Sequence, residues 1–275
     1  MPALASARPG ARPAAWGDLR KRAISAAVLA PLALLCIWLG AVPWTALLAV
    51  GVAGLAWEWV ELCGARPLAW PGVLVPLAVL AAGAVSAADR EGLALAVIAA
   101  GALAAWAASG RRALALGVPY IALGGIALVW LRSGGAAGRT NVLFVVLLVW
   151  ASDVGAYAAG RLFGGPKLAP LVSPSKTWAG SAGGLAAAAL MGAAVAWASG
   201  GGVGRAALLA GGLGVACQAG DLLESWIKRR FGVKDSGRLI PGHGGLLDRL
   251  DGLLAAAPAA ALAGLSLGQG TLLWN

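Results

Sequence analysis

Long apolar runs, separated by short polar segments, repeat along almost the whole chain. They cover approximately residues 23–42, 44–63, 70–88, 92–109, 113–131, 141–160, 179–199, 204–223 and 250–270. Most of them approach the roughly 20 residues that a helix needs to cross the hydrocarbon core of a bilayer. The pattern predicts an all-α, polytopic integral membrane protein with about nine transmembrane helices.

The composition agrees with this class. The chain is 60% hydrophobic and 12% charged, whereas soluble domains carry about 25% charged residues. The net charge of +10 would suggest nucleic acid as a partner of a soluble protein. Here the Lys and Arg residues flank apolar runs, where they orient the chain and meet anionic membrane lipid, so we expect no nucleic-acid binding. Cys36, Cys63 and Cys217 lie far apart, and we expect them to be small buried hydrophobic residues.

The distribution of positive charge predicts the orientation. If the N-terminus is cytoplasmic, all but four of the 21 Lys and Arg residues lie on the cytoplasmic side; the exceptions are Arg90, Arg132, Arg139 and Arg205. Because cytoplasmic loops are enriched in Lys and Arg, this asymmetry favours that orientation and an odd number of spans. We therefore expect a multi-pass protein of the inner (plasma) membrane whose most polar loops face the cytoplasm.

Three regions follow from this topology. They are a flexible cytoplasmic tail over residues 1–22, a membrane scaffold of about five spans over 23–140, and a catalytic region of about four spans over 141–275, with cytoplasmic loops at 161–178 and 224–249. Glu58 and Glu61 are exceptions within the scaffold, since they lie three residues apart on one helix face. We interpret them as interfacial residues beside Trp57 and Trp59, with a role in lining a cavity as the alternative.

One polar feature precedes the loop 161–178, and a second lies at the end of that loop. Asp153 lies inside an apolar run, and an intramembrane carboxylate indicates a functional site more often than a simple hydrogen bond between helices. The loop itself is rich in Gly and Pro, so it cannot be one regular helix and is expected to be irregular. At its end, the hydroxyl of Ser173 and the amine of Lys176 precede a predicted helix, where a phosphate could bind. An ordinary helix cap is the alternative.

The richest polar segment joins the last two runs. Asp221 and Glu224 share a helix face before it, and Asp248 and Asp251 share one after it. If these two helices are antiparallel neighbours, Asp221 and Asp248 converge on the cytoplasmic side. The chain has only one His, which excludes His-rich zinc sites, and carboxylate oxygens suit Mg²⁺ bound together with substrate phosphates.

Basic residues surround these acids. They are Lys228, Arg229, Lys234, Arg238 and Arg249, and all could neutralise phosphate oxygens. His243 lies in a Gly-rich turn that could approach a phosphate or a base closely, although a plain re-entry turn is the alternative. A carboxylate-bound metal with basic groups is typical of phosphoryl or nucleotidyl transfer, in which positioning and charge stabilisation provide most of the catalysis.

The segment 225–251 resembles the signature of the phosphatidate cytidylyltransferases, integral membrane enzymes that make CDP-diacylglycerol. The residues at the family's spacing are Ser225, Lys228, Arg229, Lys234, Asp235, Pro241, Gly242, His243, Gly244, Gly245, Asp248, Arg249 and Asp251. The segment beginning at Asp153 also resembles a block shared by that family. It departs from the family at Ala179, where many relatives carry an acidic or amide side chain.

The resemblance implies a Mg²⁺-dependent reaction of CTP with phosphatidate that gives CDP-diacylglycerol and pyrophosphate for phospholipid biosynthesis, with a second cation left open. It implies catalytic roles for Asp221, Asp248 and Asp251, the first two as metal ligands. The implied substrate-binding residues are Asp153, Ser173, Lys176, Lys228, Arg229, Lys234, Asp235, His243 and Arg249. A homodimer is left open.

Three other classes are weighed against this one. A CTP-using polyprenol or phytol kinase would share the membrane spans and the cytoplasmic phosphate site. A transporter would use Asp153 and the loop charges for an ion, but the charges gather at one end and not at the midplane, and the two halves show no repeated broken helices. A non-catalytic lipid-binding scaffold would leave the two pairs of acids without a purpose.

Overall fold

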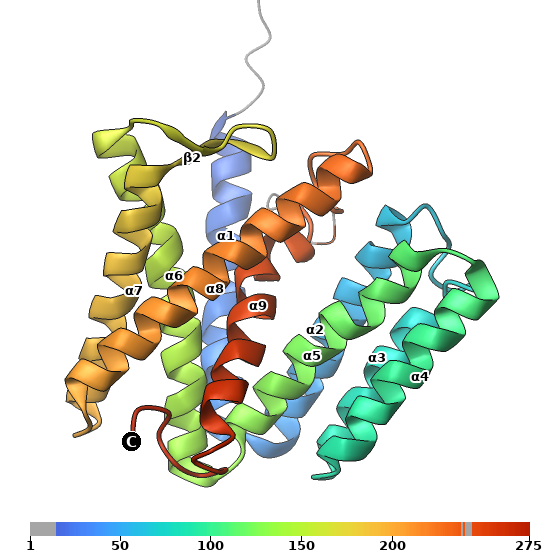
Figure 1. Ribbon diagram of the computed structural model, residues 1–275, viewed down its shortest axis with the longest axis horizontal. Coiled ribbons are helices and arrows are strands. Elements are labelled where there is room, and N and C mark those ends of the chain that lie inside the picture. The colour runs from blue at the N-terminus through green and yellow to red at the C-terminus, as the bar shows by residue number, and fades with distance from the viewer. Residues whose placement is uncertain (1–14, 238, 240–243) are drawn as a thin grey trace, which may run out of the picture.

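The computed structural model describes residues 15–237, 239 and 244–275, with side chains from residue 27 onward (Figure 1). Nine helices make up most of these described residues, in the order of the predicted runs. They are α1 (Ala15–Leu39), α2 (Ala41–Leu62), α3 (Leu74–Ser86), α4 (Glu91–Ser109), α5 (Arg112–Arg132), α6 (Gly135–Phe163), α7 (Trp178–Ala198), α8 (Val203–Arg230) and α9 (Leu247–Gly264). Arg238 and His243 lie outside the described residues.

Six helices in the described part of the chain are long and apolar enough to cross a membrane, namely α2, α4, α5, α6, α7 and α8. α3 is apolar but shorter, as is the segment Ala27–Leu39 of α1. The helix α9 carries Asp248, Arg249 and Asp251 in its first turns. The structure therefore confirms a helical polytopic membrane protein, whereas a count of nine spans stays a prediction.

Two predicted boundaries were wrong, and one predicted irregular loop contains strands. The helix α1 begins at Ala15, so the predicted tail is too long at residue 22. The helix α8 continues to Arg230, so several polar residues that were assigned to a loop belong to this helix. The loop 161–178 contains two short antiparallel strands, β1 (Lys167–Ala169) and β2 (Ser173–Thr177), which the all-α prediction missed. Strands of three and five residues are too short to show a clear alternation of polar and apolar positions.

Small residues determine how the helices pack around α7. Its buried face consists of Gly180, Gly184, Ala188, Gly192 and Ala196, which recur every four residues. Such a stripe lets helix backbones approach closely in lipid, where no hydrophobic force drives helices together. This stripe packs against α6 and α8.

The core has two parts, and α9 belongs to both. One part joins α6, α7, α8 and the C-terminal Trp274, and the other joins α2, α3 and α5. Ala256 and Ala257 of α9 lie in the first part, while Leu247 and Leu254 lie in the second. In Figure 1, α8 runs obliquely across the bundle, and the β1–β2 hairpin lies over the ends of α6 and α7.

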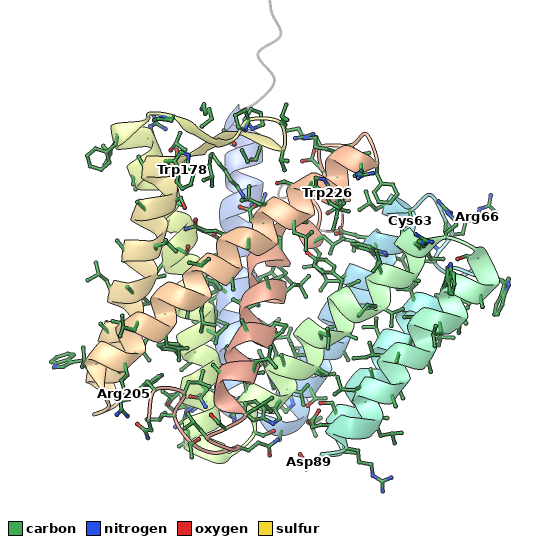
Figure 2. All side chains as sticks on the ribbon, in the orientation of Figure 1. Cys63, Arg66, Asp89, Trp178, Arg205 and Trp226 are labelled. Carbon is green, nitrogen blue, oxygen red and sulfur yellow. The ribbon has the colours of Figure 1, made fainter. Side chains whose placement is uncertain are left out.

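The connections between helices lie at two opposite ends of the bundle. Trp178 and Trp226 lie toward the hairpin end, as do Cys63 and Arg66 after α2, whereas Arg205 lies toward the opposite end (Figure 2). The two loops that were predicted to carry the chemistry therefore lie at the same end.

The packing of α7 against α6 predicts opposite effects for two Gly→Ala substitutions. A methyl group at Gly183 would overlap the Cβ of Ala159, whereas one at Gly212 in α8 would meet nothing within 4 Å. We expect Gly183→Ala to cost about 1–3 kcal/mol through overpacking. Gly212→Ala should be neutral or should stabilise the protein by about 0.5–1 kcal/mol through helix propensity. Thermal unfolding in detergent measures both, and equal melting temperatures would contradict the close packing.

Candidate active site

A cavity of about 470 Å³ opens between α6, β2, α7 and α8. Its polar lining includes Asp153 of α6, Lys176 of β2, Ser181 of α7, and Gln218 and Asp221 of α8. Four elements that are distant in the sequence therefore contribute side chains to one space. Two of these residues, Gln218 and Ser181, were not predicted to belong to a site.

Hydrogen bonds and an ion pair hold the walls of this cavity together. Lys176 forms an ion pair with Asp221, which ties β2 to α8. The Gln218 Nε2 donates to the Ser181 carbonyl oxygen at 3.0 Å, and the Ser181 hydroxyl donates to Gln218 Oε1. The Thr177 hydroxyl accepts a hydrogen bond from Gly180 N at 3.0 Å and caps α7, as expected for a hydroxyl at a helix start. Because Thr177 directly follows Lys176, this cap fixes the backbone of Lys176 relative to α7.

Three carboxylates lie close enough for their charges to interact. They are Asp153, Asp221 and Asp251, with Lys176 and Arg249 acting as the opposing positive charges on Asp153. The approach of α8 to α9 explains why Asp221 and Asp251 are neighbours, since a methyl group at Gly220 would lie 2.6 Å from the Asp251 carbonyl oxygen. Like charges this close repel one another unless a cation joins them. Lys176, which pairs with Asp221, supplies a positive charge that offsets this repulsion.

A second cluster lies where α8 meets the start of α9; we call Glu224, Lys228 and Asp248 the loop cluster. The Lys228 Nζ lies 2.6 Å from Glu224 Oε2 and 2.5 Å from Asp248 Oδ1. The other oxygen, Asp248 Oδ2, accepts hydrogen bonds from Ser236 N and Gly245 N, both at 3.0 Å. Asp248 thereby holds both ends of the connection between α8 and α9.

The predicted metal ligands Asp221 and Asp248 are engaged by different lysines. The part of the chain that the structure describes holds no group of three or more His, Cys, Asp or Glu residues that could bind a metal. Mg²⁺ is usually bound by one or two carboxylates together with substrate phosphates, so it does not require such a group. The neighbouring carboxylates of Asp221 and Asp251 fit this donor set.

The other predicted substrate-binding residues occupy more open positions. Arg229, Lys234, Asp235 and Arg249 are exposed near the connection between α8 and α9. The Arg229 Nη1 donates to the Val233 carbonyl oxygen at 3.1 Å. Ser173 is not among the residues that line the cavity, whereas Ser175 and Lys176 of the same strand are. His243 cannot be placed, because it lies outside the described residues.

The three cysteines and the two acids of α2 can also be compared with their predicted environments. Cys36, Cys63 and Cys217 are buried and unpaired, as predicted, and burial raises the pKa of the Cys63 thiol to about 11. Glu61 is exposed and accepts a hydrogen bond from Trp57 Nε1 at 2.9 Å, as an interfacial residue would. The interfacial interpretation was wrong for Glu58, which is fully buried because it bonds to the distant α8–α9 connection.

Comparison with known proteins identifies the family. A model described as the cytidylyltransferase family matches residues 20–266. The chain belongs to this family. Similar curated proteins include a phosphatidate cytidylyltransferase of Brucella suis biovar 1, 51% identical over 153 residues, which are 54% of this chain and 56% of that protein.

Two further curated relatives of this chain are also named phosphatidate cytidylyltransferase. The protein from Mycobacterium leprae is 46% identical over 161 residues, covering 56% of this chain and 48% of that protein. The protein from Haemophilus influenzae is 49% identical over 127 residues, covering 44% of each. The chain thus matches about half the length of these curated relatives.

Sequence reasoning missed several residues of the candidate site. Gln218 lies one turn before Asp221 on the same helix face, and that spacing could have indicated it. Ser181 gave no such signal, because it is one small residue in a Gly- and Ala-rich helix. Glu224 was grouped only with Asp221 on one helix face, whereas the structure pairs it with Lys228, which also pairs with Asp248.

The loop cluster predicts a large loss of stability for Asp248→Ala. This change removes the acceptor for Ser236 N and Gly245 N, and it leaves Lys228 with Glu224 alone. Leaving buried donors without a partner costs about 1–3 kcal/mol. Asp235→Ala is the matched control, because Asp235 is an exposed acid of the same connection. Thermal unfolding in detergent should show a lower melting temperature for Asp248→Ala only. Equal values for the two variants would contradict the anchoring role of Asp248.

Proposed function

We propose that this protein is a phosphatidate cytidylyltransferase, which converts CTP and phosphatidate to CDP-diacylglycerol and pyrophosphate in phospholipid biosynthesis. The observation that carries this proposal is the cavity in which Asp153, Lys176 and Asp221 meet at the polar end of an apolar helix bundle. Membership of the cytidylyltransferase family and relatives that bear this enzyme's name support it. We also propose that this end faces the cytoplasm from the inner membrane, because it carries most of the positive charge.

The reaction joins a lipid phosphate to a nucleotide. An oxygen of the phosphatidate phosphate attacks the α-phosphorus of CTP, and the bond from that phosphorus to the oxygen bridging to the β-phosphate breaks, so that pyrophosphate leaves. Negative charge increases on the leaving group, and nearby cations stabilise it. Lys176 and Arg161 are cationic residues of the cavity wall, and the amine of Lys176 could exchange its contact with Asp221 for a phosphate oxygen.

The remaining predicted residues receive roles by their positions. The exposed side chains of Arg229, Lys234 and Arg249 would attract the phosphates of CTP from water. Lys228 lies deeper and would keep the loop cluster assembled while it offers charge to the site. Asp153 lines the cavity and would contact the bound substrates. Ser173, Asp235 and His243 stay predicted substrate-binding residues.

We propose that Asp221, with Asp251 beside it and Asp248 at the start of α9, holds Mg²⁺ for this reaction. The close approach of α8 to α9 at Gly220, which brings Asp221 near Asp251, supports the first two assignments. When bound, Mg²⁺ would neutralise phosphate oxygens and polarise the reacting phosphoryl group. A second cation beside it is left open.

The proposed function predicts that Asp221→Asn abolishes most of the activity. The change keeps the size of the side chain but removes the charge that would bind a cation, so CTP-dependent formation of CDP-diacylglycerol should fall about 100-fold or more. Asp89→Asn, an exposed change in the connection between α3 and α4, is the control and should leave the rate unchanged.

The assay uses membranes with matched expression, CTP and phosphatidate, and it measures both the lipid product and pyrophosphate. Polyprenol and phytol acceptors are tested in parallel. If product forms from polyprenol or phytol but not from phosphatidate, phosphatidate is not the substrate. If no acceptor yields pyrophosphate, the proposed reaction is wrong. A normal rate in Asp221→Asn would contradict the role of that carboxylate.

Cation removal tests the proposed Mg²⁺ separately. Because carboxylates and phosphates bind Mg²⁺ reversibly, excess chelator should stop CDP-diacylglycerol formation, and added Mg²⁺ should restore it. Asp251→Asn should raise the Mg²⁺ concentration that gives half of the maximal rate, since it removes a neighbouring carboxylate. An unchanged rate in chelator would contradict the metal proposal.

A further inference from the structure

Glu58 is a buried carboxylate far from the cavity in the sequence. It lies in the last two turns of α2, its side chain is 0% exposed, and apolar residues such as Leu55 and Val60 surround that part of the helix. A carboxylate in such a place is costly unless other groups satisfy it. Neither the predicted mechanism nor the cavity lining uses this residue.

Among the described residues, the groups that donate hydrogen bonds to Glu58 belong to the connection between α8 and α9 and to the start of α9. Leu247 N donates to Oε2 at 2.9 Å, the Ser236 hydroxyl donates to Oε2 at 3.3 Å, and Leu239 N donates to Oε1 at 3.4 Å. A methyl group at Gly237 would lie 2.5 Å from Oε1, so the connection packs directly on the carboxylate. Helix α2 thus binds the connection through one side chain.

Two of these hydrogen bonds connect Glu58 to residues that bond to or adjoin Asp248 of the loop cluster. Ser236 donates its hydroxyl to Glu58 and its backbone N–H to Asp248, so it bridges the two carboxylates. Leu247 is the first residue of α9 and immediately precedes Asp248. The residue before it, Leu246, gives no side-chain cap, and Glu58 supplies the missing acceptor at this helix start. The orientation of Asp248, and with it Lys228, therefore depends on Glu58.

We propose that Glu58 is a positioning residue for the transferase reaction, which acts by holding the start of α9 and the connection before it in place. This inference rests on the proposed function for its kinetic part only. The anchoring itself can be measured without any activity.

The deciding variant is Glu58→Gln, with Glu61→Gln as the matched control. Gln has the same size as Glu, but its amide nitrogen would face either Leu247 N or Leu239 N, and two donors cannot bond to each other. Glu61→Gln makes the same chemical change one turn further along α2, at an exposed residue that bonds to Trp57. If packing alone mattered at Glu58, the two variants would behave alike.

The first measurement is steady-state kinetics of CDP-diacylglycerol formation. We expect Glu58→Gln to lower kcat/KM for CTP by about 10- to 100-fold, as removal of groups that orient active-site residues commonly does. The KM for CTP should rise, since a loss of folded protein alone would lower kcat and leave KM unchanged. Glu58→Asp keeps two acceptor oxygens and should recover part of the loss. Wild-type kinetics in Glu58→Gln would overturn the proposal.

The second measurement is amide hydrogen exchange, which remains informative if the wild-type protein makes no CDP-diacylglycerol and the proposed function fails. Peptides that contain Ser236, Gly245 and Leu247 should exchange faster in Glu58→Gln than in Glu61→Gln, while peptides from α4 should not differ. If Glu58→Gln does not fold, Ser236→Ala removes a single hydrogen bond to Glu58 and should give a smaller increase at the same peptides. Unchanged exchange there would overturn the anchoring.

Discussion

The close contact between α8 and α9 is the constraint on which the candidate site depends. A methyl group at Gly220 would lie 2.6 Å from both the Asp251 carbonyl oxygen and the Ala255 Cβ, and one at Gly252 would lie 2.6 Å from the Cys217 sulfur. Only helices without side chains at these points can approach so closely. This approach makes Asp221 of α8 a neighbour of Asp251 of α9. The site is thus built on a helix crossing and does not depend on a flexible loop alone.

Charge in an apolar bundle then determines the local arrangement. Two lysines near the site pair with an acid of another element: Lys176 of β2 with Asp221 of α8, and Lys228 of α8 with Asp248 of α9. Lys228 also pairs with Glu224 of its own helix. An unpaired charge in these half-buried positions would be costly, so the pairs keep the elements in register while no substrate is bound. Binding an anion or a cation at the cavity requires only that Lys176 and Asp221 exchange partners. The loop cluster has additional backbone donors on Asp248, and it is therefore the more rigid of the two groups.

The sequence predicted the helices well because each apolar run is long and is bounded by polar residues. It also predicted the end of the molecule that carries the polar residues, since Asp153, Lys176 and Asp221 all meet at one cavity. It did not predict β1 and β2, because strands of three and five residues in a Gly- and Pro-rich segment leave no periodic signal. The sequence also could not show that Asp153, Asp221 and Asp251 lie in one group while Glu224 and Asp248 lie in the loop cluster. Spacing of three or four shows that residues share a helix face, but it does not show which neighbouring helix that face meets.

Glu58 illustrates this limit most clearly. In the sequence it is one of two acids on the same face of an apolar run, and nothing distinguishes it from Glu61. In the structure, one turn of helix separates an exposed acid from a fully buried one, because only Glu58 meets the connection that arrives 178 or more residues later in the chain. The division into an N-terminal scaffold and a C-terminal catalytic region is therefore too simple. Helix α2 supplies an acceptor that the start of α9 lacks, and the position of Asp248 follows from a residue that the scaffold contributes.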